Sequence, residues 1–163
     1  MTQVVSRALV VLALSMATLA YGQVQDPFVG TWKLSLDKSS FPGPPPLRPY
    51  LLSFEQATDG SFVGIVFDLD EQNARTAVAR IAYRYDGMDN LDQDLVAGVP
   101  ATNSLAFTQI DGRTLEVVHK LNQGRSVYRE TRSVSEDGRT MTFVLTASDL
   151  LGPVSVVQVF DRE

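Results

Sequence analysis

The sequence contains no cysteine and a single histidine, His119. Without cysteine the chain has neither disulfides nor thiolate metal ligands, and one histidine cannot form a multi-histidine zinc site. It also lacks the Gly-x-Ser-x-Gly pattern that positions a serine nucleophile in many hydrolases. We therefore expect a protein that is not an enzyme, that binds no metal ion and that uses no cofactor.

Clusters of basic residues are also absent, and the formal net charge is −5. Without a basic cluster the chain offers no basic residues grouped to follow a phosphate backbone, so we expect no nucleic-acid partner. We expect a small hydrophobic or carboxylate ligand instead. The oligomeric state is left open.

Long hydrophobic runs are missing, because the longest, at residues 8–20, has 13 residues. A membrane-spanning helix needs about 20 apolar residues, so we expect no membrane span. Arg7 before this run and small residues after it are typical of an export signal cleaved after Ala20 or Gly22. We interpret residues 1–22 as a signal peptide and residues 23–163 as one domain, in a bacterial protein that is periplasmic or secreted.

Helical periodicity is lacking throughout, and turns recur at regular intervals. Asp-Gly pairs occupy residues 59–60, 86–87, 111–112 and 137–138, and Gly after Asp favours tight hairpins. Runs rich in β-branched and aromatic residues lie between these turns. With a weaker segment at 91–96, they predict nine or ten strands in an all-β, antiparallel up-and-down meander; the stronger runs are 31–36, 50–56, 61–69, 76–85, 104–110, 113–121, 125–135, 139–147 and 154–160.

Alternate connections of a meander fall at the same end, so the four Asp-Gly turns are expected to gather at one end of the molecule. This holds only if residues 91–96 form a strand; if they form a loop, the later Asp-Gly turns change ends. A meander of this length buries its edges by closing into a barrel. The longer connections then gather at the opposite end, at 38–49, 70–74, 97–101, 122–124 and 148–153.

The start of the first strand, Gly30-x-Trp32, resembles the start of a lipocalin or fatty-acid-binding protein, the calycin group. In those proteins the tryptophan packs across the closed end of the barrel, often against an arginine of the last strand. The resemblance implies a lipocalin-like barrel in which Arg162 has that part. The stretch also resembles small exported bacterial proteins of unknown function that begin with GTWKL.

Two features depart from the resemblance. The Thr-Asp-Tyr-type motif of lipocalins is absent, and a proline-rich loop stands where fatty-acid-binding proteins carry a helical lid.

The register of the strand at 125–135 decides which arginine faces the interior. Met141, Phe143 and Leu145 alternate with threonines and are expected to face the core. A three-residue loop at 136–138 places Arg129 on the same face as this set. A two-residue loop at 137–138 places Val134, Arg132, Glu130 and Tyr128 there instead.

The neighbouring turns favour three-residue loops, which pair Phe107 with Leu115, Val117 with Arg129 and His119 with Val127. We therefore expect Arg129 to face the interior, where it either receives a ligand carboxylate or bonds to protein acceptors. The expected ligand-lining residues are Arg129, His119, Tyr83, Phe107, Phe143 and Leu145.

Four aspartates lie close together at residues 86, 89, 92 and 94. They allow a calcium site or a solvated acidic loop, and the loop is the commoner outcome. The function expected from the whole sequence is an exported barrel that binds a small apolar or anionic, fatty-acid-like ligand. The alternative is a filled barrel that serves as an interaction or structural module of the cell envelope.

Overall fold

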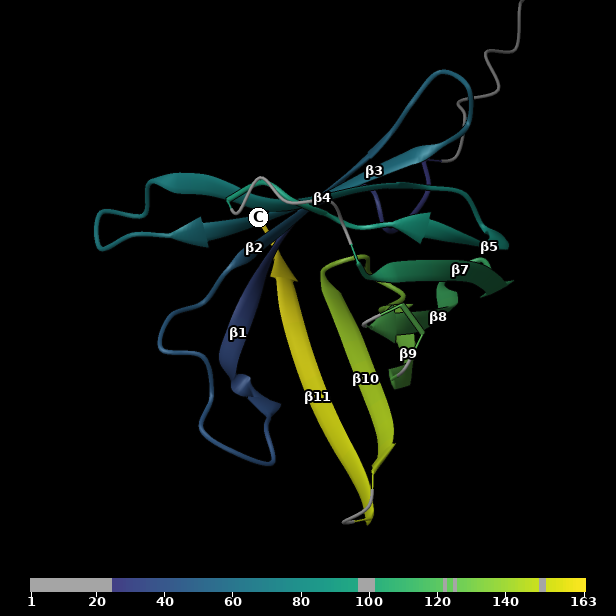
Figure 1. Ribbon diagram of the computed structural model, residues 1–163. Helices are drawn as coiled ribbons and strands as arrows, with labels where there is room; N and C mark the ends of the chain where they lie inside the picture. Colours follow the sequence, from purple (N-terminus) through teal and green to yellow (C-terminus); the bar gives the residue numbers. More distant parts are fainter. Residues whose placement is uncertain (1–24, 97–101, 122, 125, 150–151) are drawn as a thin grey trace, which may run out of the picture.

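The computed structural model describes residues 25–96, 102–121, 123–124, 126–149 and 152–163 (Figure 1). The expected export signal and the connection at 97–101 lie outside the described residues. No helix occurs in the described part, so none there is long and apolar enough to cross a membrane.

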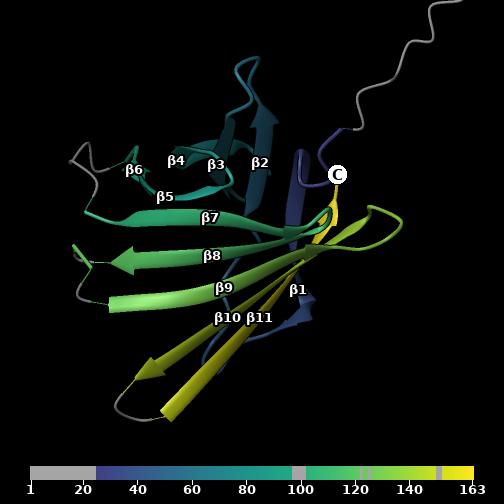
Figure 2. The same ribbon diagram turned by 90° about the vertical axis from the view of Figure 1, so that its right-hand side faces the viewer.

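Eleven antiparallel strands form one sheet that curls into a nearly closed barrel (Figures 1 and 2). The sheet order is β5-β7-β8-β9-β10-β11-β1-β2-β3-β4-β6, so consecutive strands are neighbours almost throughout and the predicted meander is confirmed. The strands are β1 (Gly30–Ser40), β2 (Leu51–Gln56), β3 (Phe62–Leu69), β4 (Arg75–Tyr83), β5 (Asp86–Leu91), β6 (Gln93–Asp94), β7 (Ser104–Asp111), β8 (Thr114–Leu121), β9 (Ser126–Val134), β10 (Thr140–Asp149) and β11 (Gly152–Arg162).

The count exceeds the predicted nine or ten because the weak segment divides into two short strands. β5 pairs with β7 and β6 pairs with β4, and the chain passes between the two ends of the sheet before β5, at residues 84–85, and after it, at Asp92. Asp86 and Gly87, expected in a turn, belong to β5, where the pairing with β7 shifts between Asp86 and Asp89. A bulge therefore lies where a hairpin was predicted.

The Asp-Gly segments gather at one end of the barrel, as predicted. Arg84 joins the β2–β3 turn to the segment before β5 through a 2.7 Å ion pair with Asp59. The carbonyl of Gly138, in the β9–β10 turn, accepts a 2.6 Å hydrogen bond from Arg162 near the C terminus. Figure 2 shows the C terminus at the same end as the β7–β8 and β9–β10 connections.

Trp32 closes this end, in agreement with the calycin resemblance. Its side chain is fully buried, and its indole N–H donates a 2.8 Å hydrogen bond to the carbonyl of Phe28. Arg162 is the direct β-partner of Trp32 and lies with its guanidinium carbon 4.0 Å from the centre of the tryptophan ring. The guanidinium also donates to the carbonyls of Val29 and Pro27, which fixes the chain entering β1.

β1 contains a large bulge against β11, because Ser35 pairs with Val159 while Ser40 pairs with Val157. Side chains bridge the bulge: the hydroxyl of Ser39 donates to the carbonyl of Ser35 and accepts a 2.9 Å hydrogen bond from the amide of Val159. Lys38 forms a 2.7 Å ion pair with Asp161. The bulge directs β1 toward the proline-rich connection at 41–50, which contains no helix.

Candidate functional site

A cavity of about 390 Å³ lies inside the barrel, toward the end opposite the Asp-Gly turns. β2, β3, β4, β7 and β10 supply its apolar wall, because each strand sends alternate side chains inward. The wall includes Leu52, Phe54, Ile81, Leu105, Phe107 and Phe143.

Aromatic rings form the floor of the cavity and separate it from the closed end. Phe107 lies between the cavity and Tyr83, whose ring stacks on it at a centroid distance of 3.9 Å. Phe62 stacks on Tyr83 in turn. Burial raises the pKa of Tyr83 well above its usual range, so this phenol is neutral.

Arg132 of β9 lies on this aromatic floor and lines the cavity. Its guanidinium carbon is 4.3 Å from the ring centre of Phe143, 5.3 Å from that of Phe107 and 5.9 Å from that of Phe54. Only 7% of the residue is exposed. Such cation–π contacts stabilise a desolvated guanidinium, but they do not replace a counter-ion.

Glu130 is that counter-ion, two residues earlier on the same face of β9. One carboxylate oxygen accepts from Nε of Arg132, and the other lies 3.0 Å from Nε2 of His119 on β8. Burial raises the pKa of Glu130, but the charge of Arg132 and the hydrogen bonds from His119 and Arg132 outweigh it and hold the pKa below its ordinary value. The carboxylate is therefore ionised.

Tyr50 and Gln158 complete the polar lining beside this network. Burial and the negative charge of Glu130 raise the pKa of Tyr50 to about 12, although a hydrogen bond with Gln158 lowers it. The phenol is neutral at physiological pH. Tyr50 also packs edge-on against Phe160, which anchors the end of the proline-rich connection to the core.

Asp68, Asp92 and Asn103 line the cavity near its open end. Burial, reinforced by the charge of Asp94, raises the pKa of Asp92, and a backbone hydrogen bond and His119 oppose the rise. Two acids, Asp68 and Asp92, therefore line the cavity here together with one base, Arg80.

The structure corrects the predicted register of β9. Arg132 pairs with Phe143 and Glu130 with Leu145, so Arg129 lies on the outer face, with 65% of its side chain exposed and a 3.3 Å contact to Glu116. Arg129 therefore does not face the interior, and the alternative with Arg132, Glu130, Tyr128 and Val134 inward is the one observed.

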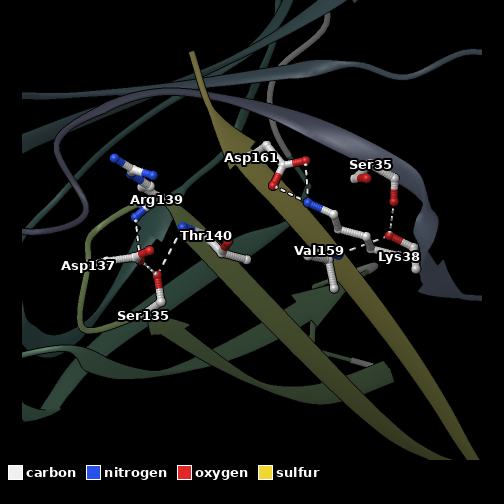
Figure 3. A network of polar contacts seen from close by, with 9 residues as sticks. Ser35, Lys38, Ser135, Asp137, Arg139, Thr140, Val159 and Asp161 are labelled. Atoms are coloured by element: carbon white, nitrogen blue, oxygen red, sulfur yellow. Dashed lines mark hydrogen bonds and ion pairs between the residues drawn. The ribbon is translucent and has the colours of Figure 1, made fainter.

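The reason for this error is the β9–β10 turn (Figure 3). Asp137 accepts hydrogen bonds from the hydroxyl of Ser135 and the amide of Arg139, while Thr140 donates to the hydroxyl of Ser135. Ser135 also pairs with Thr140 through the backbone, so the loop has an even number of residues. The assumed three-residue loop moved every side chain of β9 to the wrong face.

Only some of the other residues predicted to line the cavity do so. Phe107, Phe143 and His119 line the cavity, whereas Tyr83 lies below its floor and Leu145 is half-buried outside the lining. Phe107 pairs with Val117 and not with Leu115, but these two residues share one face of β8, so Phe107 faces inward as predicted. Tyr50 was predicted as the first residue of a strand and not as a lining residue; it directly precedes β2 and lines the cavity.

The four aspartates near β5 are engaged individually. Asp86 accepts from the amide of Met88, and Asp89 forms a 2.7 Å ion pair with Lys120. In the part of the chain that the structure describes, no three His, Cys, Asp or Glu side chains are grouped to hold a metal ion.

Comparison with known proteins identifies the fold. No protein-family model and no curated protein matches the sequence. Among solved structures, a secretory abundant heat soluble protein from Ramazzottius varieornatus superposes with a TM-score of 0.60 at 12% identity, covering 85% of this chain and 96% of that one. A Schistosoma mansoni fatty acid binding protein in complex with arachidonic acid gives 0.54 at 14% identity, covering 84% and 96%.

Zebrafish ileal bile acid-binding protein complexed with cholic acid gives a TM-score of 0.53 at 14% identity, covering 84% of this chain and 99% of that one. The sheet order, the Gly30-x-Trp32 and Arg162 closure and these neighbours identify a calycin-type β-barrel, similar in fold to fatty-acid-binding proteins.

Proposed function

We propose that this protein is an exported, non-enzymatic carrier that binds one small, largely apolar molecule inside its barrel. The observation that carries the proposal is the cavity of about 390 Å³, which has an apolar wall and a charged, hydrogen-bonded floor. Ligand pockets have volumes of about 300–1,000 Å³ and combine an apolar lining with a few polar groups. The cavity is therefore the size of a single medium-chain lipid-like molecule.

The polar end of the ligand lies at Arg132. The terminal nitrogens of its guanidinium have no hydrogen-bond acceptor among the described residues. In the same part of the chain, every fully buried side-chain nitrogen or oxygen has a hydrogen-bond partner, so these two nitrogens are not fully buried. These nitrogens therefore open on the cavity. A ligand oxygen that accepts from them is oriented with its apolar part along Leu52, Ile81 and Leu105.

Two further observations support the proposal. The similar barrels named for fatty acids and bile acids were solved with arachidonic acid and cholic acid. A filled barrel that serves as an interaction module would have no such cavity. The presence of the cavity therefore favours a ligand-binding function. Export is inferred from residues 1–22, and the mass of the mature protein from its host tests it, with cleavage after Ala20 or Gly22 expected.

Nile red, an uncharged fluorescent probe of apolar sites, tests cavity binding. Saturable binding by the wild type is expected, with loss of binding in Leu105→Trp, because the larger side chain fills the cavity. The matched control is Val144→Trp on β10, which adds the same side chain at an exposed position. Equal binding by the two variants, each folded by circular dichroism, would show that the probe lies elsewhere.

A further inference from the structure

We infer that the polar end of the ligand is an uncharged hydrogen-bond acceptor, such as an ester, ketone or aldehyde carbonyl, and that the site discriminates against carboxylates. This inference rests on the proposed function and names the class of molecule that the same cavity takes.

The charge of Arg132 is already matched by a buried acid of the protein. Glu130 is 5% exposed and contacts Arg132 directly, so the pair has no net charge. Tyr50 is neutral, and His119 contacts the same carboxylate of Glu130 at 3.0 Å. Asp68, Asp92 and Arg80 also line the cavity, and the two acids outnumber the one base on the path of an entering anion.

Although Glu130 balances the charge of Arg132, it does not use all the hydrogen-bond donors of that arginine. Each carboxylate oxygen of Glu130 is engaged, one by Arg132 and the other by His119. The terminal nitrogens of Arg132 remain as donors toward the cavity. The floor thus presents charge-assisted donors of Arg132 whose charge Glu130 already balances, a combination that fits a carbonyl oxygen.

A carboxylate placed at these donors lies beside Glu130, a second buried negative charge that shares the same arginine. Like charges in a desolvated site disfavour each other's ionised forms, so this placement weakens carboxylate binding. An ester accepts the same hydrogen bonds without this repulsion. The site therefore prefers the ester of a given acyl chain to the free acid.

Methyl decanoate and decanoate test the inference, because they share one acyl chain and differ in charge. Each is titrated against Nile red bound to the wild type at about pH 8, where the free acid is ionised. The ester is expected to displace the probe at concentrations at least about tenfold lower than decanoate. Glu130→Gln is expected to reverse or abolish this preference by improving decanoate binding. The matched control, Glu116→Gln on the outer face of β8, retains it.

Equal or tighter binding of decanoate by the wild type would overturn the inference and leave the proposed function intact. An unchanged preference in folded Glu130→Gln would also overturn it, because another group would then reject the anion. If neither compound displaces Nile red, the proposed function fails together with the inference. The wild-type comparison needs no variant, so the inference is tested even if Glu130→Gln does not fold.

Discussion

Single residues at the closed end determine how the first and last strands meet. Gly30 has a φ of 139°, which residues other than glycine rarely adopt. A Cβ atom at this position would lie 2.5 Å from a terminal nitrogen of Arg162. The same arginine bonds to Pro27, Val29 and Gly138 and stacks on Trp32. Gly30 is therefore the residue that lets the arginine reach all of them.

Gly30→Ala is expected to lower the free energy of unfolding by roughly 1–3 kcal/mol, because it strains the backbone and displaces Arg162. Urea unfolding measures the loss. Gly112→Ala is the control, since no atom lies within 4 Å of its Cβ position. Equal stability of the Gly30 and Gly112 variants would show that the closure does not depend on this contact.

Glu130 makes the stability of the floor depend on pH. Its pKa in the folded protein is lowered, so the carboxylate contributes stability above its ordinary pKa of 4.5, and this contribution is lost as the pH falls through the folded value. At neutral pH, Glu130→Gln is expected to cost roughly 3–5 kcal/mol, because Arg132 loses its buried counter-ion.

This difference in unfolding free energy is expected to shrink as the pH falls below about 4.5. Urea unfolding of both proteins across the acid range measures it. Glu116→Gln, which removes only the exposed partner of Arg129, is expected to stay within about 0.5 kcal/mol of the wild type near neutral pH. A gap that widens in acid would contradict the assignment of Glu130 as an ionised partner.

At the scale of elements, strand alternation and Asp-Gly spacing were enough to predict the meander, its closed end and the inward positions of Phe107 and Phe143. The face of β9 was not predictable in this way. Ser135 and Asp137 use their side chains to close an even-numbered loop, and a one-residue change of register exchanges Arg129 for Arg132. The length of this loop depends on side-chain hydrogen bonds, which the alternation of apolar and polar residues in the sequence does not reveal.

The division into β5 and β6 escaped prediction for a related reason. Residues 86–94 alternate poorly and are mostly exposed, so their pairing is set by the neighbours β7 and β4 and not by their own pattern.

The bulge of β1 shows how one side chain can replace a missing ladder contact. Ser39 accepts from the amide of Val159 where the pairing of β1 with β11 shifts between Ser35 and Ser40. Ser39→Ala is expected to lower the free energy of unfolding by about 1 kcal/mol. Ser40→Ala, at an exposed neighbouring position, is the control in urea unfolding. An unchanged stability in Ser39→Ala would mean that another acceptor serves Val159.

At the scale of the whole molecule, the barrel is filled at one end and hollow toward the other. Trp32, Met141 and Phe160 are fully buried toward the Asp-Gly turns, and the cavity begins where Arg132 lies on Phe107 and Phe143. This division allows the fold to be stabilised at the closed end while the open half retains space for a ligand. We propose that a ligand occupies that space with its polar end at Arg132.

Nuclear magnetic resonance of arginine-labelled protein titrated with methyl decanoate tests this claim most directly. Arg132 and Arg129 lie three residues apart on opposite faces of β9, so one side chain reports on the cavity and the other on the surface. We predict that the guanidinium signals of Arg132 shift in a saturable manner while those of Arg129 stay in place. Shifts at Arg129 without any at Arg132, or no shift at a saturating concentration, would contradict the claim.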